Sequence, residues 1–490
     1  MSESNDNNQS LELLFKPKNV VILRVGGAIE PMVKGFKRQG FNLEKLYLIS
    51  QKEESFLGLK CYKSIDEIPV DEIDLFILSI RRDLLVQTLQ EILAKKKVNF
   101  IHIFTAGTGE FDEKGTEIEY KIKEILDEYK NTRSIGPNCM GIYSPRGKTA
   151  YYSSFPEELG NIGLIFQSGD LHSKMIKFGS RRYNLRFSIG VSIGNCVDIQ
   201  ISEVLEYLNE DKDTDVICVY FEGISPIHKN EGKHLFKILK GMKKPVLFMR
   251  GGITERGQTA VLSHTGSMAT KKNIWNAVFK QTPIIEASSS LDELIDDIYL
   301  FSSYFNRFKK LEREIEYPLN KRVLIILWSG GFGILATDTL IEMGFEVPHF
   351  IGETLEKLTN IYPIRVGSLS NPLDLPFVTY QKELVDVTKA AIDENISLVI
   401  LETDAWKNLE GKRFKGYYKN LLEIREYVEK KNKTMMIILH QYPSESRKIF
   451  IDMLLTDNFL VYSSLEAAAK SFLKLCEYGK KISRFRKKNN

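Results

Sequence analysis

Residues 163–169 have the sequence GLIFQSG, in which a short apolar run ends in a Gln-Ser-Gly turn. Such a run, followed by an amphipathic stretch, predicts a buried strand that turns into a helix. Two other stretches have this form: residues 19–23 lead to a Gly-Gly turn at 26–27, and residues 322–327 lead to Ser-Gly-Gly-Phe-Gly at 329–333. Because ligands of parallel α/β sheets bind beyond the carboxyl ends of the strands, chemistry should be sought at these turns.

The same alternation continues along the chain. Strands are predicted at 46–49, 74–79, 100–104, 187–192, 216–221, 245–249, 398–401 and 434–439. Helices are predicted between them, as at 32–39 and 83–96, and a charged helix is predicted at 305–316. Strands that alternate with helices indicate βαβ units and parallel sheets. We therefore predict an α/β fold of three successive doubly wound units, with domains at 1–150, 151–310 and 311–490.

Composition excludes several classes of protein. Of the 490 residues, 43% are apolar and 27% are charged, which is typical of a folded globular chain and not of a disordered one. The sequence contains no apolar run of about 18 residues, and its polar start lacks the order of a signal peptide. We therefore expect a cytoplasmic protein that does not enter a membrane.

The net charge of +4 comes from the end of the chain, where the last eleven residues include six Lys or Arg side chains. The remainder is slightly acidic, so we expect no nucleic-acid partner. The five cysteines are scattered and form no CxxC pair, which argues against a disulfide framework and against the common zinc sites. No metal site is expected in this chain.

His264 lies in a stretch of small and hydroxyl residues, TAVLSHTGSMA at 259–269. The glycine-containing stretch 251–257 precedes it, so we expect a mobile loop around this histidine. A neutral imidazole nitrogen can attack a phosphoryl group, and a loop could then carry the phosphohistidine. On these residues alone, a loop histidine that makes only local hydrogen bonds is the commoner case.

Three other turns carry candidate side chains. Glu222, in a Phe-Glu-Gly sequence at a strand end, could orient an imidazole through its second nitrogen. Gln167, Ser168 and Gly169 form a strand-to-helix turn whose backbone N–H groups could hold an oxyanion. Residues 136–141, with the sequence GPNCMG, form a tight turn. A solvated glutamate, plain turns and a small buried cysteine are the alternatives at these positions.

In this order and spacing, the motifs resemble one family, the ADP-forming acyl-CoA synthetases, which are relatives of succinyl-CoA synthetase. The resemblance is to the alpha subunit and extends over nearly the whole chain. Further family-like stretches are Ser192-Ile193-Gly194-Asn195 with Asp198, residues 329–333 with Asp338, and Asn371-Pro372-Leu373-Asp374. The third unit points to the acetyl-CoA synthetase branch, because succinyl-CoA synthetase alpha subunits resemble only the first two units.

The resemblance implies a Rossmann-like CoA-binding domain and two flavodoxin-like, succinyl-CoA ligase-like domains, the first of which carries the phosphohistidine loop. It implies that phosphate attacks an acyl-CoA thioester to give an acyl phosphate and CoA. The phosphoryl group then passes to His264 and from there to ADP. Glu222 would hold the imidazole, and Gln167, Ser168, Gly169 and Asp170 would bind phosphate. The implied CoA-binding residues are Gly26, Gly27, Ala28, Ile49, Ser50, Ser79, Ile80, Thr105, Ala106, Gly107, Asn138 and Cys139.

The nucleotide-binding part of this family has no counterpart in the chain, because no Walker loop is present and three units leave no room for an ATP-grasp module. The resemblance therefore implies a separate ATP-grasp beta subunit in an α2β2-type assembly. That subunit would hold ADP or ATP together with Mg²⁺.

Several positions depart from the family pattern. In the CoA loop, Ala28 and Met32 replace a serine and a glycine, and Glu30 adds negative charge. Asp170 stands where a small neutral residue is usual, and an ionised carboxylate aimed at phosphate would repel it. These departures support an alternative, a non-catalytic or regulatory CoA-binding homologue of the same fold. A third alternative is an unrelated Rossmann-type enzyme, although the lack of a full GxGxxG motif disfavours a nicotinamide dehydrogenase.

Overall fold

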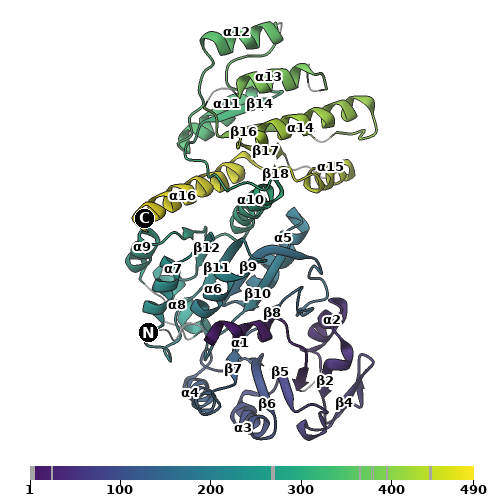
Figure 1. Cartoon of the computed structure of the whole chain (residues 1–490), viewed down its shortest axis with the longest axis vertical. Coiled ribbons are helices and arrows are strands. Elements are labelled where there is room, and N and C mark those ends of the chain that lie inside the picture. Colours follow the sequence, from purple (N-terminus) through teal and green to yellow (C-terminus); the bar gives the residue numbers. More distant parts are fainter. Residues whose placement is uncertain are drawn as a thin grey trace. The chain divides into compact units, whose positions relative to one another are not determined.

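A computed structural model describes residues 6–23, 26–265, 271–363, 366–376, 378, 380–392, 395–404, 406–440 and 444–489, with the backbone alone at 6–10, 262–265 and 486–489. The chain divides into two compact units, Met1–Ile298 and Tyr299–Asn490. The first unit contains two sheets and the second unit contains one (Figure 1). Most strand pairs in all three sheets are parallel, as the alternation of strands and helices predicts.

The first sheet has the strand order β3-β4-β2-β1-β5-β6-β7. Its pairs are parallel apart from the antiparallel β3–β4 pair. The central strand β1 is the predicted apolar run, and such a run suits a strand that is covered on both faces. The strands are β1 (Val20–Leu23), β2 (Leu46–Ile49), β3 (Ser55–Phe56), β4 (Leu59–Tyr62), β5 (Glu72–Leu78), β6 (Lys97–Ile103) and β7 (Arg133–Ile135). The helices are α1 (Asp6–Phe15), α2 (Glu30–Arg38), α3 (Leu85–Lys95), α4 (Glu113–Glu128) and the short η1 (Leu43–Lys45), η2 (Ile65–Glu67) and η3 (Arg82–Leu84).

The second sheet has the order β13-β12-β11-β9-β10-β8, and only β8 runs antiparallel to its neighbour. One buried apolar cluster includes residues of both this sheet and the first, so the two sheets belong to one folded unit. The strands are β8 (Gly141–Tyr143), β9 (Leu159–Phe166), β10 (Phe187–Ser192), β11 (Val216–Phe221), β12 (Val246–Arg250) and β13 (Ile285–Glu286). The helices are α5 (Gly169–Tyr183), α6 (Ile201–Glu210), α7 (Glu231–Lys240), α8 (Glu255–Thr265), α9 (Lys272–Gln281) and α10 (Leu291–Lys310).

The third sheet, in the second unit, has the order β15-β14-β16-β17-β18 and a separate apolar core. Its pairs are all parallel. The strands are β14 (Val323–Leu327), β15 (Leu373–Asp374), β16 (Leu398–Thr403), β17 (Thr434–Leu439) and β18 (Leu460–Tyr462). The helices are α11 (Gly330–Glu342), α12 (Gly352–Ile361), α13 (Glu383–Ala391), α14 (Lys412–Lys430), α15 (Glu445–Thr456) and α16 (Leu465–Asn489).

The predicted fold class, three successive α/β units, is confirmed by these three sheets. The domain boundaries at 150 and 310 stay predictions. The predicted charged helix at 305–316 is wrong, because α10 starts earlier, at Leu291, and stops at Lys310. Leu294, Ile298 and Phe308 are buried along α10, and Glu312 has a φ of +51°, a left-handed conformation that a helix cannot continue through.

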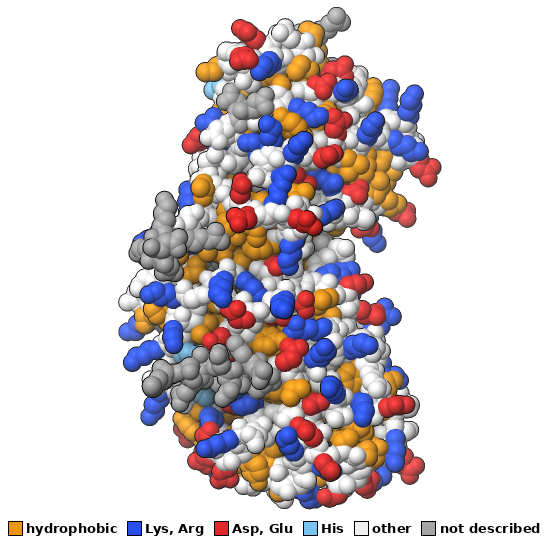
Figure 2. Space-filling model, in the orientation of Figure 1, with side chains coloured by type: hydrophobic (Ala, Val, Ile, Leu, Met, Phe, Trp, Pro, Cys, Tyr) orange, Lys and Arg blue, Asp and Glu red, His pale blue; other side chains and the backbone are white. Residues whose placement is uncertain are grey.

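The surface carries charges of both signs. Lys and Arg side chains are interspersed with Asp and Glu side chains over the face shown in Figure 2. Within the described ranges, every helix is too short or too polar to cross a lipid bilayer.

Candidate active site

A cavity of about 900 Å³ lies at the carboxyl ends of β1, β2 and β5 in the first sheet. This is the edge at which parallel α/β sheets bind ligands. Seven of the residues predicted to bind CoA line it: Gly26, Gly27, Ala28, Ile49, Ser50, Ser79 and Ile80. Residues far apart in the sequence thus meet at one opening, as three neighbouring strand ends in a parallel sheet should.

The Gly26-Gly27 turn leaves open space beside the start of α2. A Cβ atom added at either glycine would meet no other atom within 4 Å. The N–H groups of Ile29 and Glu30 donate to the carbonyl oxygen of Gly26, at 2.9 and 3.0 Å, and close the first turn. A phosphate group could therefore approach the backbone here without meeting a side chain of the turn. Residues 24 and 25, where the turn begins, lie outside the described part.

Three cationic side chains, Lys52, Lys63 and Arg81, also line the cavity, together with the acidic Glu53 and Glu91. Lysine and arginine provide charge-assisted hydrogen bonds to phosphate oxygens. Because the CoA moiety carries several phosphates, these side chains and the open glycine turn fit such a ligand. Sequence reasoning missed the three cations, since each lies in a surface segment with no local motif.

Glu30, which the sequence marks as an unfavourable charge, makes an ion pair with Lys34 at 2.5 Å. It is absent from the cavity lining in the described structure. The positive charge of Lys34, one turn along α2, therefore partly offsets the negative charge of Glu30, which then disfavours the binding of an anion less.

The other predicted CoA-binding residues lie outside this cavity lining. The Thr105 hydroxyl donates to the carbonyl oxygen of Ile80 (2.8 Å) and accepts from its N–H (3.1 Å), so it supports the cavity wall from behind. Asn138 donates its backbone N–H to the Thr105 carbonyl oxygen at 2.9 Å. Cys139 is buried, and burial raises the pKa of its thiol, which argues against a thiolate there. A direct contact of Thr105, Ala106, Gly107, Asn138 or Cys139 with CoA stays a prediction.

Ser168 starts helix α5 as the sequence predicts. Its hydroxyl accepts a hydrogen bond from the N–H of Leu171 at 3.4 Å, and β9 ends two residues before it. A Cβ atom at Gly169 would lie 2.8 Å from Cγ of Met140, so the next residue must be small. Strand end, serine cap and glycine together make a helix N-terminus with N–H groups available to an anion.

Asp170, the sharpest departure from the family pattern, pairs with Lys174 at 2.7 Å along α5. Both side chains are largely exposed, at 68% and 46%. An aspartate in the first turn also favours the helix dipole. The carboxylate is thus engaged with the next turn of its own helix, which weakens the argument that it repels phosphate.

Glu222 lies beyond the end of β11 and is 5% exposed. Gln167 ties this strand end to the start of α5: its Oε1 accepts the N–H of Gly223 at 3.1 Å and that of Glu222, and its Nε2 donates to the Gly223 carbonyl oxygen at 2.9 Å. The predicted phosphate turn and the predicted orienting carboxylate are therefore held together through one glutamine side chain.

The side chain of Glu222 points toward two further groups. Burial, the charge of Glu222 and a hydrogen bond to it raise the pKa of the Tyr220 hydroxyl. A Cβ atom at Gly251 would come within 3.0 Å of that hydroxyl oxygen and 3.4 Å of Glu222 Cγ. Gly251 opens the segment that leads to α8, so this segment passes close to the carboxylate. Sequence reasoning did not identify Tyr220.

The prediction of a loop around His264 is wrong for the backbone up to Thr265, which is helical in α8. The Thr254 hydroxyl accepts the N–H of Gly257 at 3.1 Å, so Thr254 caps a helix despite the glycines nearby. The side chain of His264 and residues 266–270 lie outside the described part. The role of His264 and its distance from Glu222 stay predictions.

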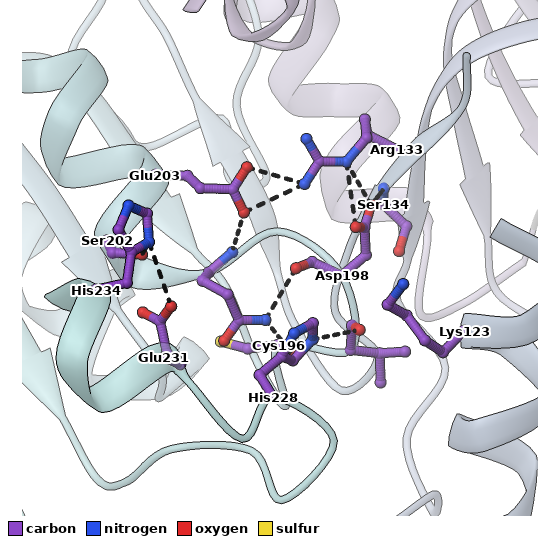
Figure 3. Close-up of polar contacts among 12 residues, drawn as sticks. Lys123, Arg133, Ser134, Cys196, Asp198, Ser202, Glu203, His228, Glu231 and His234 are labelled. Atoms are coloured by element: carbon purple, nitrogen blue, oxygen red, sulfur yellow. Dashed lines mark hydrogen bonds and ion pairs between the residues drawn. The ribbon is translucent and has the colours of Figure 1, made fainter. Parts of the chain in front are cut away.

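The turn after β10 is fixed by a charged network that the sequence did not reveal (Figure 3). Arg133, at the start of β7, donates to Asp198 at 2.9 Å and to Glu203 at 2.9 Å. Asp198 also accepts the backbone N–H of Ser134 at 2.7 Å. This network joins the last strand of the first sheet to the loop that carries Asn195 and to the start of α6.

Two domain families match the chain: the CoA binding domain over residues 33–145 and the succinyl-CoA ligase like flavodoxin domain over residues 159–301. A Methanocaldococcus jannaschii ADP-forming acetate–CoA ligase is 36% identical over 377 residues, which cover 74% of this chain and 49% of that protein. The chain therefore spans about half the length of that relative. The Pyrococcus furiosus ADP-forming acetate–CoA ligase I subunit alpha is 28% identical, with 96% of this chain and 98% of that protein covered.

A solved structure shares the fold over its whole length. It is the Ca. Korarchaeum cryptofilum dinucleotide forming acetyl-coenzyme A synthetase 1 in complex with phosphate and ADP, with a TM-score of 0.79, 22% identity and 98% of both chains covered. The chain thus combines a CoA-binding domain with a succinyl-CoA ligase-like flavodoxin domain, and it is a homologue of the alpha subunits of ADP-forming acetate–CoA ligases.

Proposed function

We propose that this chain is the alpha subunit of an ADP-forming acyl-CoA synthetase of the acetyl-CoA type. The reaction converts acyl-CoA, phosphate and ADP into the free acid, CoA and ATP. The observation that carries the proposal is a pair of sites in the first unit. A cavity with an open glycine turn and three cations lies at the edge of the first sheet, and a serine-capped helix tied to a buried glutamate lies at the edge of the second.

The residues of the two sites have separate roles in this proposal. The cavity at Gly26 and Gly27 holds the CoA phosphates. The backbone N–H groups at the start of α5 bind the phosphate, which attacks the thioester carbon and displaces CoA as a thiolate. His264 then takes the phosphoryl group through an N–P bond, the acid leaves as a carboxylate, and Glu222 holds the imidazole so that one ring nitrogen faces the phosphorus.

The proposal includes a partner. The alpha-subunit name of the Pyrococcus relative implies a second subunit for that protein, and this chain covers nearly all of it. We propose an ATP-grasp beta subunit that holds ADP and Mg²⁺, in an α2β2-type assembly. A cytoplasmic location belongs to the proposal as well, and the five buried, unpaired cysteines suit a reducing compartment.

Incubation of the chain with acetyl-CoA and radiolabelled phosphate tests the function. The expected result is an acid-labile, alkali-stable label on the protein that disappears in His264→Ala. His349→Asn is the matched control, because His349 is an exposed histidine in the second unit. Loss of label in the His349 variant, or its persistence in the His264 variant, would contradict the assignment.

The same experiment separates the enzyme from the non-catalytic homologue. A chain that binds CoA in calorimetric titration but takes no label, with or without a beta subunit and ATP, is a CoA-binding homologue without catalysis. A chain that shows no heat with millimolar CoA lacks the cofactor site altogether.

A further inference from the structure

Two carboxyl groups meet in a buried cluster between the first and second sheets. Glu119 projects from α4 and is 5% exposed, while the half-buried Glu110 comes from the loop after β6. Asn195, from the loop after β10, is 3% exposed, and Thr108 is fully buried. The cluster therefore combines loops at the carboxyl ends of strands in both sheets with helix α4.

The hydrogen bonds in this cluster bring both carboxyl groups to the same two donors, the Asn195 amide and the Thr108 hydroxyl. Asn195 Nδ2 donates to Glu110 Oε2 at 2.6 Å and to Glu119 Oε1 at 2.8 Å. The Thr108 hydroxyl oxygen lies 3.0 Å from the same Glu110 oxygen and 2.8 Å from the same Glu119 oxygen. A hydroxyl has a single hydrogen and cannot donate to both. Two carboxylates that share donors in this way repel unless one of them is protonated.

The surroundings favour a proton on Glu119. Burial raises the pKa of Glu119, and the nearby charge of Glu110 raises it further, against hydrogen bonds from Asn195, Thr108 and the Gly109 N–H group. The Gly107 N–H group donates to the other oxygen of Glu110 at 2.5 Å.

The charged groups nearby already have partners. Arg82 pairs with Asp112 at 2.8 Å, and Lys123, one turn further along α4, pairs with Asp127. The third neighbour, the buried thiol of Cys196, has a raised pKa and is neutral. Among the described residues, neither glutamate of the cluster makes an ion pair.

The cluster is connected to the CoA cavity by a short chain of contacts. Asn195 Oδ1 accepts from Asn138 Nδ2 at 3.4 Å. Asn138 donates its backbone N–H to Thr105, and Thr105 bonds to Ile80 in the cavity wall. The loop that carries Asn195 is itself anchored at Asp198 by Arg133 (Figure 3). The side-chain amide of Asn138 therefore contacts the glutamate cluster through Asn195, while its backbone is bonded to Thr105, which supports the cavity wall.

We propose that Glu119 is a positioning residue that shares a proton with Glu110 and so holds the Asn195 and Asn138 amides where the two sheets meet. This inference rests on the proposed function, in which Asn138 is one of the residues that contact CoA. When the shared proton is lost at high pH, the two carboxylates repel and the amides lose their fixed orientation.

Three variants and one control test the inference by calorimetric titration of the full chain with CoA between pH 6 and 9. The wild type should bind CoA more weakly at high pH, where the shared proton is lost. The amide introduced by Glu119→Gln keeps a donor toward Glu110. This variant should therefore bind CoA within about 3-fold of the wild type at pH 6, and its binding should not weaken at high pH. Glu119→Ala should bind about 10-fold more weakly at every pH, and Glu110→Gln should resemble Glu119→Gln. Glu117→Gln, at an exposed position of the same helix, should match the wild type.

The inference is overturned if Glu119→Gln weakens binding as much as Glu119→Ala and keeps the pH dependence, or if all variants match the wild type. Infrared spectroscopy gives a readout that needs no ligand: the wild type at pH 7 should show the C=O stretch of a buried protonated carboxyl, which Glu119→Gln lacks. Absence of that band overturns the shared proton. If the band is present but the wild type binds no CoA, the shared proton stands, whereas the positioning role and the proposed function fall.

Discussion

In the second sheet, β9 ends at Phe166 and Ser168 caps α5; in the third sheet, β14 ends at Leu327 and Ser329 caps α11. The strand next to the capped one is β11 in the first case and β16 in the second. The pairing of β9 with β11, extended two residues past its last pair, places Ser168 opposite Glu222. The pairing of β14 with β16, extended by three residues, places Ser329 opposite Asp404. Both sheets thus place an acidic residue beside a serine-capped helix.

The two places differ in the side chain that comes directly after the strand. Gln167 holds the backbone at Glu222 and Gly223, and Glu222 is buried. The equivalent position in the third sheet is Trp328, whose ring packs 5.9 Å from that of Tyr417, and Asp404 is exposed. The backbone therefore repeats the helix start in both sheets, whereas one side chain after the strand decides whether the carboxylate is enclosed.

The third sheet encloses a different carboxyl group. Glu402, two residues before Asp404, is 6% exposed and lies 3.5 Å from Nε2 of His440. Burial, with the charge of Asp404 adding to it, raises the pKa of Glu402 to about 7. The two sheets therefore bury acidic groups at different positions along otherwise similar strand ends.

The largest expected effect is a difference in labelling rate between variants at Glu222 and at Asp404. Glu222→Gln should lower the rate of protein labelling from acetyl-CoA and phosphate by about 10²–10³-fold, because the imidazole loses its orienting acceptor. Asp404→Asn, its counterpart in register, should change the rate by less than about 3-fold. Equal losses in both variants would mean that the third sheet takes an equal part in the chemistry.

Removal of the glutamine bridge should have the next largest effect, on stability. Gln167→Leu leaves two buried N–H groups and one carbonyl oxygen without their partner, which should reduce the free energy of unfolding of the first unit by about 3 kcal/mol. Denaturant unfolding followed by hydrogen exchange in β9 and β11 measures this. Gln51→Leu, at an exposed position, is the control and should have little effect. A loss below about 1 kcal/mol in Gln167→Leu would show that the bridge contributes little.

The raised pKa of Glu402 predicts a pH dependence confined to the second unit. The unfolded chain ionises this group above pH about 4.5, while the folded unit keeps it protonated up to about 7. Stability should therefore be greatest below pH about 4.5 and fall as the pH rises to 7, by no more than about 3 kcal/mol. Hydrogen exchange of β16 and β17 between pH 5 and 8 reports it, and Glu402→Gln should flatten the profile. An unchanged slope in that variant would assign the effect to another group.

The smallest effect concerns Asp170. Because its exposed carboxylate pairs with Lys174 along α5, Asp170→Asn should change stability by less than about 0.5 kcal/mol and the KM for phosphate by less than about 3-fold. Lys174→Met, which frees the carboxylate, should raise that KM more than Asp170→Asn does. A large gain in phosphate affinity for Asp170→Asn would show that the carboxylate repels phosphate after all.

Much of the fold could be predicted because its strands are continuous apolar runs. Residues 216–221 and 434–439 are strands at the predicted bounds, since a parallel strand covered on both faces needs no alternation. The predictions failed where local composition and packing disagree: glycines near 251–257 indicated a loop, yet Thr254 caps a helix there. In α10, the charged residues at the end of the helix led to a predicted helix at 305–316, and the buried part from Leu291 onward was missed.

The candidate site could be predicted only in part. Turns after strands marked Gly26 and Ser168 as neighbours of a ligand, and the family resemblance added Ser50 and Ser79. Of these four, Gly26, Ser50 and Ser79 line one cavity. Lys63 and Arg81 at that cavity carry no local signature, because any surface segment can contain a cation. In the sequence, Glu119 is one of several acidic residues of a helix. Its burial and its contacts with Thr108 and Asn195 are visible only in the tertiary structure.

The sequence by itself determined the order of the α/β units and the turns at which ligands would bind, because strand runs and strand-to-helix turns depend on residues next to one another. Only the tertiary structure decided which side chains share a site. Gln167 reaches Glu222 and Asn195 reaches Glu110 across 55 and 85 positions of chain, and such contacts arise from the packing of strands and loops. Local periodicity fixes where a strand ends, but the pairing of strands fixes what lies beside that end.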